Sequence, residues 1–438
     1  MKWIKRIFIF VTGLIAAIAI SLFTYKQIRM SKAKDSLIPA ETKALIQINV
    51  DGLLTELMGN ALSNPNTYFF GDRDTSGRRP AKVWETGLKI PAMIFFFSEK
   101  ADADQYYSVQ EVKDLKRFKR FFKDQLHIDL DSNSSAVDGG YSYYQQKKLA
   151  ILMSEKQIVL SIGRDSLNQS AKLKELLQAD RTTWLNALAW SKTHSEEQEA
   201  DVVWSNADKN WFSFDFQNGS VHVDGLVKSD KWRFPDVARQ LKPEPNTVLS
   251  AYLDADLSSW IQSQDSLLKK LDLPVDSVHK YYGGYVDINW LEKDVLQRES
   301  VISYEYDDNF EMKEVVQTQD VEAPNLLLRL KGSPHLLGYL PEKLFYTFQK
   351  SNDGDLLSLY TGEKGTEAAA FAKAKLVFNF NYRQSTTVIK HLGWLPKFDR
   401  WQKIQLEGNA RDPHSLKLHG YFVLGHEKIH ALYQLLED

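Results

Sequence analysis

The sequence of 438 residues contains no cysteine. That absence excludes disulfide bonds, thiolate nucleophiles, zinc or iron–sulfur clusters held by cysteine, and an acylated N-terminal cysteine. Net charge is small as well, because 55 Lys and Arg oppose 57 Asp and Glu. Residues 1–34 hold seven of the bases and no acid, so the remainder carries 48 − 57 = −9. An acidic body repels phosphate backbones, and we therefore predict no nucleic-acid partner.

Long apolar runs are scarce, and the one of spanning length is Ile7–Tyr25. A helix rising about 1.5 Å per residue over this run matches a hydrocarbon core of about 30 Å. Trp3 and Tyr25 bracket it with rings that favour the membrane interface. We predict a transmembrane signal-anchor at 7–25, a cytoplasmic N-terminus at 1–6 and a linker at 26–37. A cleaved signal peptide with a small-x-small site at Ala17–Ala19 is the alternative.

The short basic N-terminus sets the predicted orientation. A short basic segment ahead of the anchor is typical of signal-anchor proteins, and it places residues 35–438 across the membrane. Three basic residues precede the anchor and four follow it, so charge counting leaves the reverse orientation open. A large ectodomain without cysteine is typical of a bacterial envelope protein rather than a disulfide-built extracellular one. We expect a single-pass protein of the bacterial inner membrane with its bulk in the periplasm.

Beyond the linker, the pattern predicts two similar modules, residues 38–241 and 242–438. Each opens with a proline followed by a strand-like run, and each closes with a run of alternating apolar residues, Ser220–Val227 and Ser415–Phe422. Strands joined by turns, with helices between groups of strands, favour an α+β fold. We predict that each module is a mainly antiparallel sheet covered by helices.

The elements expected inside the modules follow from apolar periodicity and turn residues. Strands are predicted at Ala44–Val50, Ala92–Phe97, Leu149–Met153, Gln157–Ile162, Gly284–Trp290 and Lys375–Asn381. Helices are predicted within Val112–Leu126, Ser166–Gln178, His335–Phe348 and Thr386–Leu395. The second module has an extra stretch, Leu291–Pro324, in which Val301–Tyr306 and Glu314–Val316 are predicted to pair as a protruding hairpin, and Asp72–Lys82 is expected to be a loop in the first.

The basic apolar N-terminus, the opening strand IPAETKALIQINV at residues 38–50 and the two α+β copies carry a resemblance. The chain resembles uncharacterised membrane-anchored envelope proteins of Bacteroidota with a duplicated α+β module. Many members of that group resemble lipoproteins with an acylated cysteine, and this chain departs from them by using a helix. The resemblance implies an envelope location and brings no activity, cofactor or functional residues. A second likeness, to inner-membrane-anchored proteins whose β-rich grooves conduct lipids, depends on the anchor and the strands.

The segment His426-Glu427-Lys428-Ile429-His430 fits the H-E-x-x-H pattern. On a helix its two histidines would share one face and could ligate zinc while Glu427 acts as general base. A third ligand is the difficulty, because Glu437 is the one nearby downstream carboxylate that could reach that face. We favour a plain amphipathic C-terminal helix, with its inward residues at Ile429, Leu432, Leu435 and Leu436.

The stretch Asp129–Asn133 begins like a calcium loop. It departs where Ser134 replaces the required glycine and Gly140 replaces the bidentate glutamate, so a surface turn is the better interpretation.

A basic amphipathic segment spans Lys113–Lys123, with its apolar stripe at Leu115, Phe118, Phe122 and Leu126. It could lie on an anionic membrane, although packing of the stripe on the module's own sheet is favoured. Asp254 and Asp256 could form an acid–base pair, and capping of the following helix by Asp256 is the favoured alternative.

These observations predict a non-catalytic, membrane-anchored periplasmic binding or scaffold protein that acts through envelope protein partners, without cofactors. Two alternatives stay open. Aromatic residues make up 12% of the chain and could line the groove of a lipid- or glycan-binding carrier. A zinc-dependent hydrolase would use His426 and His430, the two candidate metal ligands.

Overall fold

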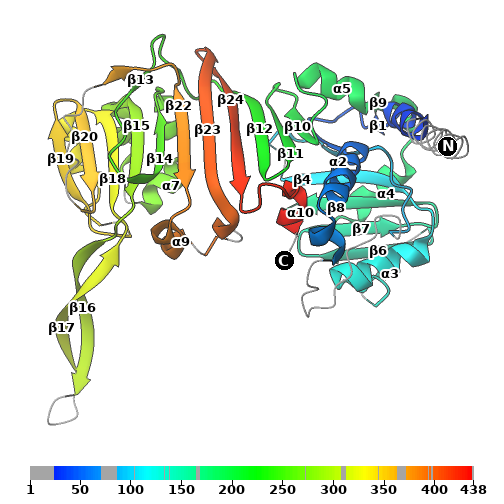
Figure 1. Ribbon diagram of the computed structural model, residues 1–438, viewed down its shortest axis with the longest axis horizontal. Helices are drawn as coiled ribbons and strands as arrows, with labels where there is room; N and C mark the ends of the chain where they lie inside the picture. Colours follow the sequence, from blue (N-terminus) through cyan, green and yellow to red (C-terminus); the bar gives the residue numbers. More distant parts are fainter. Residues whose placement is uncertain are drawn as a thin grey trace, which may run out of the picture. The chain divides into compact units, whose positions relative to one another are not determined.

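The structure is a computed structural model that describes residues 24–70, 86–102, 104–132, 134–137, 139–163, 168–271, 273–306, 312–343, 345–362, 371–392, 394–395 and 398–436. It divides into two compact units, Met1–Phe216 and Gln217–Asp438. Each is a mixed α+β unit dominated by an antiparallel sheet, as predicted (Figure 1). The strand Ser220–Lys228 belongs to the second unit, where it pairs with Ser415–Leu424, and the module boundary after Leu241 stays a prediction.

The sheet of the first unit has the strand order β11–β10–β2–β3–β4–β8–β7–β6–β5, antiparallel throughout. The predicted strands of this unit are confirmed to within one residue at either end. A separate pair joins β1 (Leu37–Ile38) to β9 (Leu185–Asn186). The strands of the sheet are β2 (Ala44–Asn49), β3 (Met93–Ser98), β4 (Gln105–Glu111), β5 (Ser135–Val137), β6 (Tyr141–Gln146), β7 (Leu149–Met153), β8 (Gln157–Gly163), β10 (Val202–Asn206) and β11 (Trp211–Gln217).

Helices cover both faces of this sheet. Neighbouring side chains of β7 point to opposite faces of the sheet. Leu152 packs on one face with residues of α4 (Ser170–Gln178) and α5 (Ala187–His194), and Ile151 packs on the other with residues of α3 (Leu115–Leu126). The remaining helical segments of this unit are α2 (Val50–Ser63), a π-helical turn (Asn66–Phe70) and a 3₁₀ turn (Arg181–Thr183).

Residues 24–34 form a further helix that docks on the first unit. Arg29 Nη2 lies 2.8 Å from Asp51 Oδ1 on α2, and Ala33 is buried in the core. The segment predicted as a linker, 26–37, is therefore helical through residue 34. No helix among the described residues is long and apolar enough to cross a membrane. The predicted anchor at 7–25 lies outside those residues except for its last two, and the predicted loop Asp72–Lys82 lies wholly outside them.

The sheet of the second unit has the order β12–β24–β23–β22–β14–β15–β18–β20–β19, again antiparallel. Two-stranded pairs join β13 (Arg239–Gln240) to β21 (Ala372–Lys373), and β16 (Val295–Tyr306) to β17 (Met312–Ala323). The strands of the sheet are β12 (Ser220–Lys228), β14 (Thr247–Leu253), β15 (Tyr282–Leu291), β18 (Leu326–Gly332), β19 (Gln349–Asp353), β20 (Leu356–Tyr360), β22 (Phe378–Arg383), β23 (Trp401–Asp412) and β24 (Ser415–Leu424).

The strands β12 and β24 are the two closing runs recognised in the sequence, and they pair with each other from Ser220↔Val423 to Lys228↔Ser415. Gly219 precedes β12 with a φ of +71°, and a Cβ built there would stand 2.5 Å from the Cα of Glu427. Glycine is required at this position both by the left-handed backbone and by the close approach of the two chain segments.

Short helices complete the second unit: α6 (Ser258–Gln262), α7 (Asp265–Lys270), α8 (Val275–Tyr281), α9 (Thr386–Leu392) and α10 (Ala431–Leu436), with 3₁₀ turns at Pro334–Gly338 and Phe398–Arg400. The predicted helix within His335–Phe348 is wrong, since only its first residues are helical. Pro341 supplies no N–H and disfavours helical backbone at the residue before it. The predicted strand Lys375–Asn381 begins later, at Phe378, and the helix predicted over Thr386–Leu395 ends at Leu392.

Candidate functional site

The most distinctive surface feature is a β-ribbon formed by β16 and β17, which we call the arm (Val295–Ala323). Its register runs unbroken from Val295↔Ala323 to Tyr306↔Met312, which confirms the predicted hairpin and extends it. Figure 1 shows the arm leaving the sheet of its own unit as a two-stranded ribbon. Within the described part of the chain, β16 and β17 pair only with each other, so both outer edges present unpaired backbone groups.

Most of the described side chains of the arm are exposed, including apolar ones. Leu296, Met312 and Val316 have relative accessibilities of 71%, 67% and 65%. Met312 and Val316 are four residues apart on β17 and so point to the same face of the ribbon. At the root the arm is packed, because Ala323 is 1% exposed. The same face also carries the exposed polar side chains of Thr318 and Asp320, so it is mixed in character, and a two-stranded ribbon is by itself marginally stable in water.

Hydrogen bonds and ion pairs hold the arm at its root. The side chain of Gln297 donates to the carbonyl oxygens of Thr347 (2.7 Å) and Thr361 (2.9 Å) and accepts from the Thr347 N–H (3.1 Å). Glu299 pairs with Lys343 at 2.9 Å. Lys390 on α9 bonds to Glu322, and this contact raises the pKa of its ammonium group. The arm therefore leaves the second unit in a fixed direction.

Two exposed aromatic side chains flank this root. Phe345 lies in the turn between Lys343 and Thr347, both of which contact the arm, and its relative accessibility is 84%. Trp394 follows α9, whose Lys390 contacts the arm, and is 75% exposed. We use the name root patch for these two residues and Leu296, three exposed apolar side chains on segments that contact one another at the root. Exposed aromatics of this kind are enriched where proteins bind one another.

A buried ionic cluster in the second unit holds the most perturbed titratable groups. Arg329 on β18 makes a two-pronged bond to Asp287 on β15, with Nε–Oδ1 at 2.9 Å and Nη2–Oδ2 at 2.8 Å. Its Nη1 lies 3.6 Å from Glu244 Oε1, and all three side chains are nearly fully buried. Burial raises the pKa of Asp287, and the bonds from Arg329 oppose that rise.

The same cluster fastens the segment ahead of β14 onto the sheet. Arg329 Nη2 donates to the Lys242 carbonyl oxygen at 3.3 Å, and Tyr285 OH, which donates to Asp287, accepts from the Leu241 N–H at 3.1 Å. Burial also raises the pKa of Tyr285. The ring of Phe371 packs edge-on against that of Tyr285, with the ring centroids 5.0 Å apart. The charged and polar groups of Arg329, Asp287 and Tyr285 bond to other groups of the same unit, so we interpret this cluster as structural and call it the clasp.

The structure separates the two aspartates weighed as an acid–base pair. Asp254 is fully buried. Its carboxylate accepts hydrogen bonds from the Nη2 of Arg239 at 2.7 Å and from the Arg239 backbone N–H at 2.6 Å. Burial, with a smaller contribution from Asp254, raises the pKa of Tyr252 to about 12. Asp256 instead accepts the N–H of Ser258, the first residue of α6, at 2.9 Å from one position before the N-cap residue, Leu257.

The segment that fits H-E-x-x-H is a turn, which corrects the predicted helix. The helix α10 begins at Ala431, so His426 and His430 share no helical face. His430 is buried and bridges to Asn218, whereas His426 is exposed. Gln434 stabilises the turn by donating to the carbonyl oxygens of His426 and Ile429. Ile429 is buried as expected, but Leu436 is exposed. No group of three or more potential metal ligands occurs among the residues that the structure describes.

The calcium-like stretch is a surface turn, as favoured from the sequence. Asp129 accepts the N–H groups of Asp131 and Ser132 at 3.0 and 3.1 Å and pairs with Lys123 at 2.7 Å. These bonds, the one from Lys123 foremost, lower the pKa of Asp129 to about 2. A metal ion would have to displace that ammonium group.

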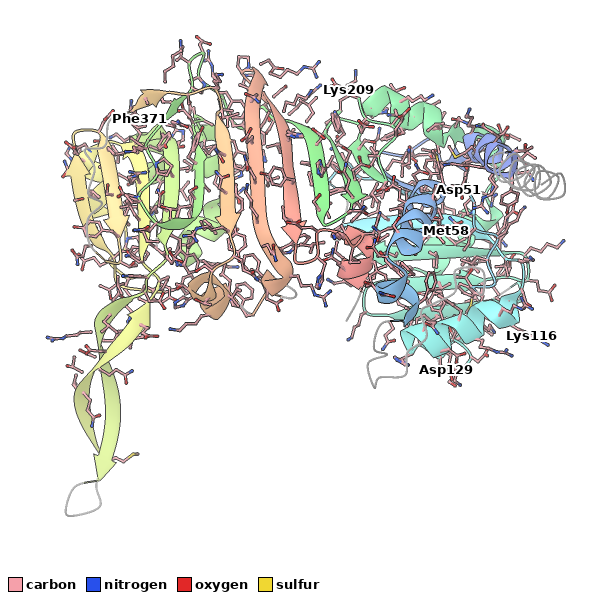
Figure 2. The ribbon with its side chains drawn as sticks, viewed as in Figure 1. Asp51, Met58, Lys116, Asp129, Lys209 and Phe371 are labelled. Atoms are coloured by element: carbon pink, nitrogen blue, oxygen red, sulfur yellow. The ribbon has the colours of Figure 1, made fainter. Side chains whose placement is uncertain are left out.

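The basic segment forms α3, whose N-cap Asp114 accepts the Arg117 N–H. Phe118 is fully buried against the sheet and Phe122 packs beside it, which confirms the favoured interpretation. A shallow hollow beside the helix is lined by Lys116, Lys119, Arg120, Lys123, Asp129 and Asp131. Figure 2 labels Lys116 and Asp129 of this set. Since Lys119 and Lys123 already pair with Asp131 and Asp129, the face is mixed rather than uniformly basic.

Sequence reasoning found the arm but missed the root patch and the clasp. Charged residues inside otherwise apolar strands, Asp287 in β15 and Arg329 in β18, were an available signal for the clasp. The root patch gave no local signal, because its three residues come from separate segments.

The fold and these features define an α+β protein built on antiparallel sheets, with a projecting arm. No family model matches the chain, and no curated protein matches it. Among solved structures it is similar to crystal forms I and III of TP0453, at 11% sequence identity, covering 75% of this chain and 94% of that chain. The TM-scores are 0.21 and 0.22, so this likeness carries no argument about the function of the chain.

Proposed function

We propose that this chain is a non-catalytic, membrane-anchored scaffold or binding protein of the bacterial envelope that engages a protein partner through the arm. The observation that carries the proposal is the arm itself. It is a long ribbon with exposed apolar side chains, two open edges and a root fixed by hydrogen bonds and ion pairs. Ribbons of this kind serve recognition by adding strands to, or receiving strands from, another chain.

The proposal includes residues 7–25 as the anchor in the inner membrane, residues 1–6 in the cytoplasm and the remainder in the periplasm. Support comes from the uncharged run in the sequence and from the docked helix that follows it. Because Arg29 and Ala33 tie that helix to the first unit, the unit would stand close to the bilayer.

The proposal further includes duplication of one module. In each unit the opening strand, β2 or β14, lies inside the sheet between a late strand, β10 or β22, and the next strand of the module, β3 or β15. Outward from there the orders β4–β8–β7 and β18–β20–β19 correspond. The arm is an insertion in the second copy, so it marks where that copy acquired a function of its own.

A comparison of two full-length proteins tests the proposed function. One carries the arm and in the other residues 297–321 are replaced by a short glycine-containing turn, and each is purified in detergent after crosslinking in cells. We expect a stoichiometric envelope protein to copurify with the first and not with the second. Protein that comes out alone with bound zinc or lipid would contradict the proposal, in favour of a hydrolase using His426 and His430 or of a carrier. The variant Val237→Glu, at an exposed site away from the arm, is the matched control.

A further inference from the structure

The hollow beside α3 in the first unit has a volume of about 430 Å³. Its lining consists of four bases and two acids: Lys116, Lys119, Arg120, Lys123, Asp129 and Asp131. The bases are spaced three, one and three residues apart, so they share one face of the helix. The lining carries a net charge of 4 − 2 = +2, whereas the chain beyond residue 34 carries −9. The hollow is therefore a positively charged site on an acidic chain.

Two of these bases have no partner in the protein. Lys116 and Arg120 are exposed and lie one helical turn apart on α3. Within the described part of the chain, neither side chain forms an ion pair or a hydrogen bond. The planar guanidinium group of Arg120 presents donors in a fork that matches two oxygens of a phosphate or carboxylate group, and the ammonium group of Lys116 adds a charge beside it. Both side chains are available to an anion from outside the chain.

The other two bases are held in place on the lining. Lys119 Nζ lies 2.6 Å from Asp131 Oδ1, and Lys123 Nζ lies 2.7 Å from Asp129 Oδ2. Asp129 is fixed in turn by the backbone N–H groups of Asp131 and Ser132. An ammonium group can donate more than one hydrogen bond, so each lysine keeps donors for a ligand after it has paired. Because the two lysines are already ordered, they lose less side-chain entropy when a ligand binds.

The charge and the composition of the lining fit a phosphate monoester. Such a group carries about −1.5 to −2 at pH 7, which matches the net charge of the hollow. Among the described residues, no aromatic or apolar side chain lines the hollow, so it offers no ring for a nucleobase and no surface for an acyl chain. Its volume falls within the range of about 300–1,000 Å³ found for ligand sites, which leaves room for a polar group attached to the phosphate.

We propose that the hollow beside α3 binds a phosphate monoester, with Lys116 and Arg120 donating to the phosphate oxygens while Lys119 and Lys123 supply further charge. The organic part of the ligand is polar and rich in hydroxyl groups, as in a phosphorylated glycerol or sugar. The headgroup of a lipid and a soluble phosphorylated polyol offer this same chemistry. The site adds a ligand to the proposed function and does not depend on the arm.

Isothermal titration calorimetry of the full-length protein in detergent tests the site. The probes are glycerol 3-phosphate and a short-chain phosphatidic acid placed in the detergent micelle. We expect glycerol 3-phosphate to bind about tenfold more tightly than dimethyl phosphate, a diester with a single negative charge. Tighter binding of phosphatidic acid than of glycerol 3-phosphate would identify a lipid as the source of the phosphate, and equal affinity would identify a soluble ligand. The proposal holds in both cases.

Three double variants locate the binding on the hollow. K116Q/R120Q should lower the affinity for glycerol 3-phosphate about tenfold or more, because it removes the charge-assisted hydrogen bonds. K116R/R120K conserves the charge and should keep most of the affinity. The matched control K174Q/K192Q removes the same charge from α4 and α5, which pack on the other face of the sheet, and should leave the affinity unchanged. Glutamine is a good helix former, so the Tm of K116Q/R120Q should match that of the parent.

Three results would overturn the inference. Absence of binding by both probes would show that the hollow is only a solvated face of α3. Affinity for glycerol 3-phosphate that survives K116Q/R120Q would place the phosphate elsewhere on the chain. Equal affinities for dimethyl phosphate and glycerol 3-phosphate would show a response to any anion rather than to a phosphate monoester. None of these results bears on the partner crosslinked through the arm, so the proposed function is tested separately.

Discussion

Removal of the Arg329 guanidinium should destabilise the second unit more than any surface substitution. The variant Arg329→Met leaves Asp287 and Glu244 buried without their cation, at side-chain accessibilities of 4% and 5%. Breaking a buried pair from one side costs about 3–5 kcal/mol, because the remaining charge is neither solvated nor paired. For a unit of about 200 residues, that loss corresponds to a fall in Tm of about 6–20 °C.

The assay is thermal melting of the full-length protein in detergent, followed by tryptophan fluorescence. The control is Arg298→Met, because Arg298 and Asp320 form an exposed pair, 85% and 59% accessible, whose loss costs about 0–1 kcal/mol. The double variant Arg329→Met with Asp287→Leu should recover part of the Tm, since an apolar pair needs no solvation. Equal shifts for Arg329→Met and Arg298→Met would refute the reasoning.

The variant should also respond to pH. The pKa of Asp287 in the folded unit is raised above its unfolded value by burial, and Arg329 holds that rise in check. A carboxyl group with a raised pKa favours the folded state most at low pH, and this contribution is lost as pH rises through its folded pKa. Without Arg329 the rise is larger, so the Tm deficit of the variant should be greater at pH 7 than at pH 4.5. A deficit that does not change with pH would show that Asp287 is not the group left uncompensated.

Three further predictions concern other parts of the chain. Gly219→Ala should lower the Tm by several degrees, because the added methyl group meets the Glu427 backbone. Gly140 is also at positive φ but has open space around it, so Gly140→Ala should lower the Tm less, and equal losses of Tm would contradict the close approach at Gly219. His430→Ala should lower the Tm, since that side chain is buried, and His426→Ala should not. Neither variant should change the zinc content measured by atomic emission; loss of bound zinc from either would instead revive the metal site. Asp129 should titrate in carboxyl-carbon NMR with a midpoint near 2, whereas a midpoint near 4 would rule out the bond from Lys123. Because its folded pKa is lowered, the stability that Asp129 contributes should be present above pH 4 and lost as pH falls through 2, so Asp129→Asn should make the Tm less dependent on pH in the acid range.

Local patterns predicted what depends on local physics. Alternation and turn residues were enough to predict the strands Leu149–Met153 and Gln157–Ile162 and the hairpin around Val301 and Val316. The stripe in α3 was likewise predictable, because Phe118 and Phe122 are one turn apart. The helix predicted within His335–Phe348 is wrong beyond Gly338, because Pro341 interrupts the apolar run and cannot donate a helical hydrogen bond.

What could not be predicted depends on contacts between distant residues. Asp287 and Arg329 meet because β15 and β18 pair in one particular register, which no short window of sequence reveals. The pairing of β12 with β24 is of the same kind, since the two strands lie nearly two hundred residues apart. The helical start at Ala431 rather than at His426 follows from the Gln434 side chain, which holds the turn before it.

The pairing of β12 with β24 has a consequence for synthesis of the chain. Ser415 follows Lys228 by 415 − 228 = 187 positions in the sequence, so β12 leaves the ribosome long before its neighbour exists. Throughout that interval one edge of β12 is open to pairing with any other nascent strand. The second unit can complete its sheet only after β24 has been translated. Until then, chaperones or fast translation of the intervening codons would have to keep the open edge of β12 from pairing with other chains.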